Sequence, residues 1–167
     1  MKAPARPAVA EGSLRSSSTG ATRHLGARLG RAAQPGTVLA LVGPLGAGKT
    51  QLAKGVARGL GVRSVVNSPT FVIVNEHVGR LSLFHVDAYR VADVDEARQA
   101  GVFDERQAGG VTVIEWADRL EGWLPPDHLR IEITTDPAAF EHRLLRWQAT
   151  GPHHRRLAQA LDRSTPP

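Results

Sequence analysis

Two kinds of hydrophobic pattern along this chain predict its strands. Thr37–Val42 and Val111–Ile114 are almost entirely apolar, which is typical of strands buried on both faces of a parallel sheet. Leu129–Ile133 and Arg143–Trp147 instead alternate between apolar and polar residues, which favours antiparallel strands with one exposed face. The chain therefore contains both the buried and the half-exposed strands of a mixed sheet.

Apolar residues at helical spacing separate these strands. In the first helix, Leu25 and Leu29 share an apolar face, Thr22 is the expected N-cap, and Pro35 follows the end. Asp93 is the expected cap of a later short helix. Strands that alternate with helices indicate an α/β fold. The predicted helices span residues 22–33, 51–60, 94–100 and 153–161.

Residues 71–75 and 81–87 predict the two strands of a β-hairpin around a turn. The second strand places His85, Asp87 and Tyr89 on one face of the extended chain. A face of charged and hydrogen-bonding side chains beside an apolar one suggests a functional site. An edge strand with solvated polar residues is the alternative.

The segment Gly43–Thr50 reads Gly-Pro-Leu-Gly-Ala-Gly-Lys-Thr and matches the phosphate-binding P-loop pattern. A buried strand precedes it and a helix follows, which favours a P-loop over a glycine-rich turn. Its glycines allow successive N–H groups to converge on phosphate oxygens at the helix N-terminus. The pattern predicts that Lys49 reaches the β- and γ-phosphates and that the Thr50 hydroxyl binds magnesium.

Two carboxylates are candidates for the chemistry beside this loop. Asp87 and Glu115 both stand at the ends of apolar strands, where P-loop folds hold magnesium or orient a water. The sequence pattern does not choose between them. The loop Ser68-Pro69-Thr70 follows the P-loop helix at a position where nucleotide-sensing switch segments lie, although an ordinary turn has the same composition.

Length and composition limit the other possibilities. The chain has 167 residues and no cysteine, which excludes disulfides and thiolate sites, and no apolar run approaches the roughly 20 residues that span a bilayer. The net charge of +5 suggests an anionic partner, either ATP or RNA, without identifying it. A C-terminal group of basic residues has two readings, nucleic-acid contact or a solvated face: Arg143, Arg146, His153, His154, Arg155 and Arg156.

These patterns together predict a P-loop NTPase-like three-layer α/β fold. Its central sheet is expected to be mixed and mostly parallel, with an antiparallel hairpin and antiparallel edge strands. Residues 1–18 are rich in Ala, Pro, Arg and Ser, without periodicity, and are predicted to be a disordered tail. Residues 19–162 are predicted to form one P-loop ATPase domain, and residues 163–167 a disordered C-terminal tail.

The motifs in this order resemble the bacterial TsaE (YjeE) family of small P-loop ATPases. That family is required to make threonylcarbamoyladenosine beside the anticodon of tRNA. The resemblance runs from about Thr19 to Gly151. Four segments carry it: Gly43–Thr50, Ser68–Phe71, His85–Arg90 and Ile114–Trp116.

The resemblance implies ATP and magnesium as cofactors. Pro44 and Thr19 depart from the family pattern, because many relatives carry an acidic residue at these two positions, and the departures concern the contacts to adenine. The implied nucleotide-binding residues are Thr19, Thr22, Gly43, Leu45, Gly46, Ala47, Gly48, Lys49, Thr50 and Gln51. Those with implied catalytic roles are Lys49, Asp87 and Glu115, and the implied magnesium ligands are Thr50, Glu115 and Asp87. The implied switch residues are Ser68, Pro69, Thr70, His85, Tyr89, Arg90 and Trp116.

The resemblance also implies partners and a cellular location. TsaD and TsaB are the expected partners, tRNA is reached through their complex, no membrane is involved, and the location is cytoplasmic. Two other functions fit the same site: a small kinase that phosphorylates a metabolite at His85, Asp87 and Arg90, and a nucleotide-gated binding module with negligible hydrolysis. The short segment between Gly101 and Val111 has no room for a kinase lid, which favours the ATPase.

Overall fold

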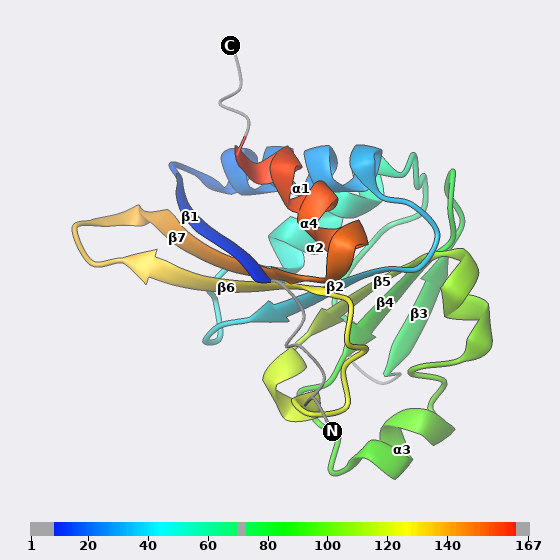
Figure 1. Ribbon diagram of the computed structural model, residues 1–167. Helices are drawn as coiled ribbons and strands as arrows, with labels where there is room; N and C mark the ends of the chain where they lie inside the picture. Colours follow the sequence, from blue (N-terminus) through cyan, green and yellow to red (C-terminus); the bar gives the residue numbers. More distant parts are fainter. Residues whose placement is uncertain (1–8, 70–72, 163–167) are drawn as a thin grey trace, which may run out of the picture.

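The fold is built on one seven-stranded mixed sheet, which Figure 1 shows edge-on in the computed structural model. The structure describes residues 9–69 and 73–162. The strand order is β1-β7-β6-β2-β5-β4-β3. The strands are β1 (Val9–Ser16), β2 (Thr37–Val42), β3 (Val74–His77), β4 (Leu83–Asp87), β5 (Val111–Glu115), β6 (Leu129–Asp136) and β7 (Ala139–Thr150).

The centre of this sheet is parallel and its margins are antiparallel. Strands β6, β2, β5 and β4 run parallel to one another. At one margin β3 pairs antiparallel with β4, and at the other β7 pairs antiparallel with β6 and β1 with β7. The predicted fold class is therefore confirmed, including the hairpin and the antiparallel margins.

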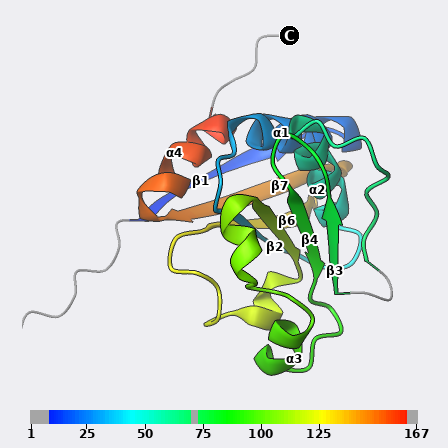
Figure 2. The same cartoon turned by 90° about the vertical axis from the view of Figure 1, so that its right-hand side faces the viewer.

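Helices cover the two faces of the sheet unequally. Both views place α1 (Thr19–Ala32), α2 (Lys49–Gly59) and α4 (Gly151–Asp162) on one side and α3 (Val94–Gln99) on the other (Figures 1 and 2). Two 3₁₀-helices, η1 (Glu105–Gly109) and η2 (Ala117–Leu120), complete the chain. Each face has its own buried core, with Leu29, Leu52 and Ile131 in the larger one and Ile114 and Leu120 in the smaller.

Helices α1 and α2 approach each other unusually closely through facing glycines. A Cβ on Gly26 of α1 would lie 2.3 Å from the carbonyl oxygen of Leu52. A Cβ on Gly55 of α2 would lie 2.2 Å from the carbonyl oxygen of Arg23. Gly30 and Gly59 repeat this arrangement one turn further along. Only residues without a side chain allow the two backbones to come this near.

The structure corrects the predicted N-terminal tail. Val9–Ser16 is not disordered but forms β1 and pairs along its whole length with β7. Gly12 lies against Trp147, where a Cβ would come within 2.6 Å of the ring. Residues 1–8 and 163–167 lie outside the described part of the chain, so the predictions for those ends remain predictions.

Two local assignments differ from those predicted, and one alternative is excluded. The N-cap of α1 is Ser18, whose hydroxyl accepts from the Ala21 amide, whereas Thr22 is buried and its hydroxyl lies 2.7 Å from that of Ser16. Strand β4 is not an edge strand, because it lies between β5 and β3. Strand β6 pairs antiparallel with β7 as predicted but parallel with β2, which makes it part of the parallel core.

Candidate functional site

The P-loop lies where β2 ends and α2 begins, as its position in the sequence predicts. Gly43 leaves the strand with a positive φ of 153°, and a Cβ there would lie 2.3 Å from the Ile133 carbonyl oxygen. Gly48 has a left-handed backbone and caps α2 without a side chain. The first turn of α2 therefore directs its N–H groups toward the space in front of the loop, where anions bind favourably.

Lys49 is buried at the centre of this loop. Its Nζ donates hydrogen bonds to the carbonyl oxygens of Gly43, at 2.6 Å, and Pro44, at 2.9 Å, and lies 3.9 Å from the centroid of the Trp116 ring. Burial lowers the pKa of Lys49, while the nearby carboxylates of Glu115, Asp118 and Asp87 act in the opposite direction. The ammonium is thus held over the loop by one ring and two carbonyls.

Glu115 joins three elements at the ends of the parallel strands. It is the last residue of β5 and is buried, with its Oε2 accepting from the Thr50 hydroxyl at 2.9 Å. Its Oε1 lies 2.7 Å from Nε2 of His85, which is fully buried in β4. Both carboxylate oxygens therefore have partners, and the chain His85–Glu115–Thr50 fixes the hydroxyl at the start of α2.

Asp87 anchors the loop that follows α2. Its Oδ2 accepts from the Ser68 hydroxyl at 2.6 Å, and its Oδ1 accepts from the Tyr89 amide at 2.9 Å. Asp87 and Glu115 are register partners on neighbouring parallel strands, so their side chains lie at the same edge of the sheet. The two candidate carboxylates thus have different neighbours: the P-loop threonine for Glu115 and the predicted switch loop for Asp87.

Trp116 closes the site next to Glu115. Its φ of 58° is in the left-handed region, which is rare for a residue with a bulky side chain. This backbone turns the ring toward Lys49, and the centroid of the Tyr89 ring lies 4.8 Å from it. The left-handed backbone of a bulky residue at this place is a feature that functional sites commonly contain.

These groups surround one cavity of about 370 Å³. Most of the predicted nucleotide-binding and catalytic residues line it or bond to residues that do. Its lining consists of Leu45, Gly46, Gly48, Lys49, Thr50, Gln51, Ser68, Asp87, Tyr89, Glu115 and Trp116.

Some predicted site residues lie elsewhere. Thr19 and Thr22 do not line the cavity, and Thr22 instead bonds to Ser16 and to the Ser18 carbonyl. Arg90 is exposed on the segment after β4. Pro69 is buried, and Thr70 lies outside the described residues.

Arg143 of β7 supports the P-loop, although the sequence analysis grouped it with the C-terminal basic residues. Its Nε donates to the Ala47 carbonyl at 2.9 Å, and its Nη1 donates to the Phe140 carbonyl at 2.7 Å. The predicted C-terminal basic cluster is therefore not one patch. His154, from the same cluster, is buried at the start of α4 and bonds to Asp127 and to the Val38 amide. Nothing in the local sequence connects Arg143 with a loop 96 positions earlier.

Comparison with known proteins agrees with this geometry. The family described as "Threonylcarbamoyl adenosine biosynthesis protein TsaE" matches residues 16–144. The chain belongs to the TsaE family. A protein from Bacillus subtilis named tRNA threonylcarbamoyladenosine biosynthesis protein TsaE is 40% identical over 132 residues, which cover 78% of this chain and 81% of the relative. A protein of the same name from Streptomyces coelicolor is 42% identical over 114 residues, or 66% of this chain and 77% of the relative.

A solved structure extends the agreement to three dimensions. The crystal structure of YdiB from Bacillus subtilis superposes with a TM-score of 0.74 at 34% identity, covering 93% of this chain and 96% of that one. This chain is thus a P-loop protein of the TsaE family with a nucleotide-binding fold. In the described residues, no helix is both long enough and apolar enough to cross a membrane.

Proposed function

We propose that this protein binds ATP with magnesium in the P-loop cavity and hydrolyses it as the ATPase of threonylcarbamoyladenosine formation on tRNA, together with TsaD and TsaB. One observation carries the proposal. The P-loop residues Lys49 and Thr50 face a cavity that also contains two strand-end carboxylates, and one of these is already bonded to Thr50. The names of the relatives support the choice of pathway.

The chain's own residues would bind the phosphates in two ways, and Arg143 would support the loop that carries them. The N–H groups of the loop and of the first turn of α2 donate to phosphate oxygens. Lys49 moves its ammonium from the carbonyls of Gly43 and Pro44 to the β- and γ-phosphates, where it neutralises negative charge. The guanidinium of Arg143 donates to the Ala47 carbonyl oxygen and so helps to fix the backbone of the loop.

The cavity also fits magnesium. The Thr50 hydroxyl and the Glu115 and Asp87 carboxylates are oxygen ligands, and magnesium usually takes one or two carboxylates together with phosphate oxygens and waters. The described residues contain no group of three or more His, Cys, Asp or Glu that would hold a metal ion without the nucleotide. A metal shared with the phosphates suits this donor set, and it would supply charge neutralisation at the γ-phosphate.

Glu115 and Asp87 would have different roles in metal binding and in water orientation. Glu115 keeps Thr50 oriented, and His85 behind it fixes the carboxylate, so this group suits metal binding. Asp87 borders the same cavity and touches the loop at Ser68, so it suits the orientation of the attacking water and transmits the position of the loop. Among the described residues that line the cavity, Lys49 is the one cation. Fast phosphoryl transfer needs more positive charge near the γ-phosphate. An arginine supplied by another protein can raise the rate about 10³- to 10⁵-fold.

Hydrolysis with and without partners tests this function. Single-turnover ATP hydrolysis should be slow for the protein alone and faster with TsaD and TsaB present. Lys49→Ala should abolish the reaction in both conditions, because it removes the charge that faces the phosphates. Lys54→Ala is the matched control, since it removes the other lysine of α2 at a site outside the cavity.

Two outcomes would contradict the proposal. Equal rates with and without partners would indicate a self-sufficient ATPase or a passive binding module. Activity that survives in the Lys49→Ala variant would place the reaction outside the P-loop.

A further inference from the structure

A long part of this chain carries no negative charge. Residues 12–75 contain eight Lys or Arg and no Asp or Glu, although the whole chain has 16 acidic residues. This part contains the second half of β1 and the whole of α1, β2 and α2. One of the eight cations is Lys49, which the nucleotide cavity uses. The others lie outside that cavity. Residues 12–75 carry a net charge of +8, whereas the rest of the chain has 13 Lys or Arg against 16 Asp or Glu, so the net positive charge comes from this part.

Four of these cations line one open groove of about 600 Å³ between α1, α2 and the loop after α2. Arg23 comes from α1, Lys54 and Arg58 from α2, and Arg63 from the loop. Arg23, Arg58 and Arg63 are exposed. No carboxylate lines the groove, and none of the four cations forms an ion pair within the described part of the chain. Like charges gathered without a counter-charge repel one another, so an anion bound there would be stabilised.

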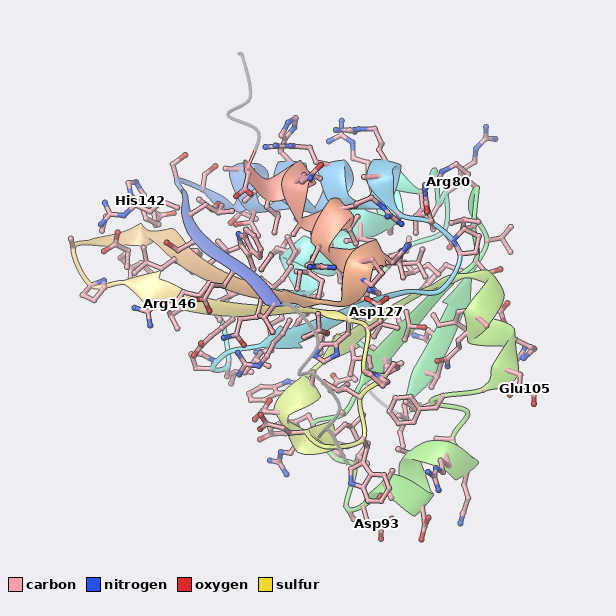
Figure 3. The ribbon with its side chains drawn as sticks, in the orientation of Figure 1. Arg80, Asp93, Glu105, Asp127, His142 and Arg146 are labelled. Carbon is pink, nitrogen blue, oxygen red and sulfur yellow. The ribbon has the colours of Figure 1, made fainter. Side chains whose placement is uncertain are left out.

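The glycine contact explains why these cations come together. Arg23 is 31 positions before Lys54, yet its carbonyl oxygen would lie only 2.2 Å from a Cβ on Gly55. The backbone of α1 thus lies directly against α2 at this point, and the cationic side chains of both helices share one surface. Figure 3 shows side chains with nitrogen ends along the outer side of α1. The surface is rigid because the two backbones that carry it are in contact.

The chemistry of the groove favours a phosphate polymer. Guanidinium groups match phosphate oxygens, and several cations along an open groove suit regularly spaced phosphates better than one small anion. Residues 12–75 contain Phe71 as their single aromatic residue, and the groove itself is lined by none. Single-stranded nucleic acids are usually bound with aromatic residues that stack on the bases. The groove therefore suits a folded, double-helical region, which proteins recognise through its backbone.

We propose that the groove formed by Arg23, Lys54, Arg58 and Arg63 binds the phosphate backbone of a helical region of tRNA. The choice of tRNA rests on the proposed function, whereas the choice of a phosphate backbone rests on the charges. The contact is direct, in addition to any that the partner proteins make. The groove also adjoins the nucleotide cavity, because Arg23 Nε donates at 2.7 Å to Gln51, which lines that cavity.

Anisotropy of a fluorescent tRNA, titrated with the full chain over a range of salt concentrations, tests this proposal. The Arg58→Gln/Arg63→Gln double variant should bind tRNA at least about 10-fold more weakly, and the slope of log K against log salt should fall by about one for each arginine that no longer meets a phosphate. The control is the Arg106→Gln/Arg130→Gln double variant. It makes the same change in net charge at two arginines far from the groove in the sequence and in other elements.

The outcomes separate this proposal from the function on which it rests. If the two double variants lose the same affinity, or if the unmodified protein shows no salt-dependent tRNA binding, the groove proposal is wrong. Partner-stimulated ATP hydrolysis, measured in parallel without tRNA, should stay unchanged in both double variants. If the groove variant instead keeps its tRNA affinity and loses TsaD and TsaB, the groove binds an acidic protein surface and the proposal fails.

Discussion

The two halves of this molecule differ in packing and in charge. The α1–α2 half has long helices in backbone contact and no acidic residue between positions 12 and 75. Residues 76–121 instead form strands β4 and β5 and the short helices α3, η1 and η2, and hold ten Asp or Glu against five Lys or Arg. Figure 3 shows one of these acidic residues, Asp93, on the side of the sheet away from α1.

The proposed nucleotide site lies where these halves meet. Lys49 and Thr50 come from the rigid, basic half, and Asp87, Glu115 and Trp116 from the acidic half. The rigid half can hold the phosphate loop in one shape, because its helices leave no space for adjustment. In the acidic half β4 and β5 are buried inside the sheet, whereas the short helices α3 and η1 are mostly exposed and can rearrange at lower cost. The difference suggests that one half binds phosphate and the other responds to it.

The largest predicted effect comes from disrupting the glycine contact between α1 and α2. Gly26→Ala places a methyl group against a backbone carbonyl, so the helices must separate, and we expect the free energy of unfolding to fall by about 3 kcal/mol. Urea unfolding measures the change. Gly20→Ala is the matched control, because the nearest atom to a Cβ there is 3.7 Å away. Alanine favours the helix over glycine, so this control should be as stable as the unmodified protein or slightly more stable. Equal stability of both variants would show that the close contact is not important.

The second prediction concerns the acidic half. Glu115→Gln should reduce magnesium-dependent hydrolysis about 10- to 100-fold, because it removes the charge that Thr50 and the metal share. Asp87→Asn is the comparison and should change the response to magnesium less, since its carboxylate bonds to Ser68. Turnover measured against magnesium concentration separates the two. If Asp87→Asn removes the magnesium dependence and Glu115→Gln does not, the two roles are reversed.

The same glutamate also affects stability. Both of its oxygens are bonded and its side chain is buried, so Glu115→Ala leaves buried His85 without its partner. We expect Glu115→Ala to lower the free energy of unfolding by about 2 kcal/mol and Glu115→Gln to lower it less. Urea unfolding of the two variants measures the difference. Glu115 is therefore expected to contribute to the stability of the fold as well as to the site.

Sequence patterns identified the features that depend on local composition. The P-loop, the parallel strands and the strand-end residues Asp87 and Glu115 follow from runs and motifs that neighbouring residues specify. The sequence pattern does not predict β1, because its inward positions hold Ala10, Gly12, Leu14 and Ser16, of which only Leu14 is large and apolar. Its pairing partner β7 also lies more than 120 residues later in the chain. The Arg143 contact with the P-loop and the facing glycines of α1 and α2 depend on tertiary packing. The spacing of the glycines is visible in the sequence, but their orientation is not.

The smallest predicted effect is at His154, which connects α4 to β2. Its Nε2 accepts from the Val38 amide at 2.8 Å, so its proton is on Nδ1, which faces Asp127. Burial lowers the pKa of His154, opposed by Asp127 and assisted by His153 and His128. Below its ordinary pKa of about 6.5 the unfolded chain binds a proton that the folded protein does not, so stability is lost as the pH falls through this range.

Unfolding at pH 7.5 and at pH 5.5 checks this effect. Since one proton is involved, the slope cannot exceed about 1.4 kcal/mol per pH unit. The His154→Gln variant should lose less stability between the two pH values than the unmodified protein does. An equal loss in both proteins would mean that another group causes the dependence, and buried His77, whose pKa is also lowered by burial, would be the next to change.

The glycine contact has a mechanical consequence. Carbonyl oxygens of each helix lie in the gaps that the glycines of the other leave open, at four places over two turns. A small sliding of α1 along α2 would drive these oxygens into neighbouring side chains, so the pair moves as one body. A displacement of α2 at the phosphate loop therefore reaches the start of α1, where the Thr22 hydroxyl is 2.7 Å from that of Ser16 at the end of β1. The edge strand β1 is thus connected to the phosphate loop through α1 and α2, and a movement of the loop can displace it.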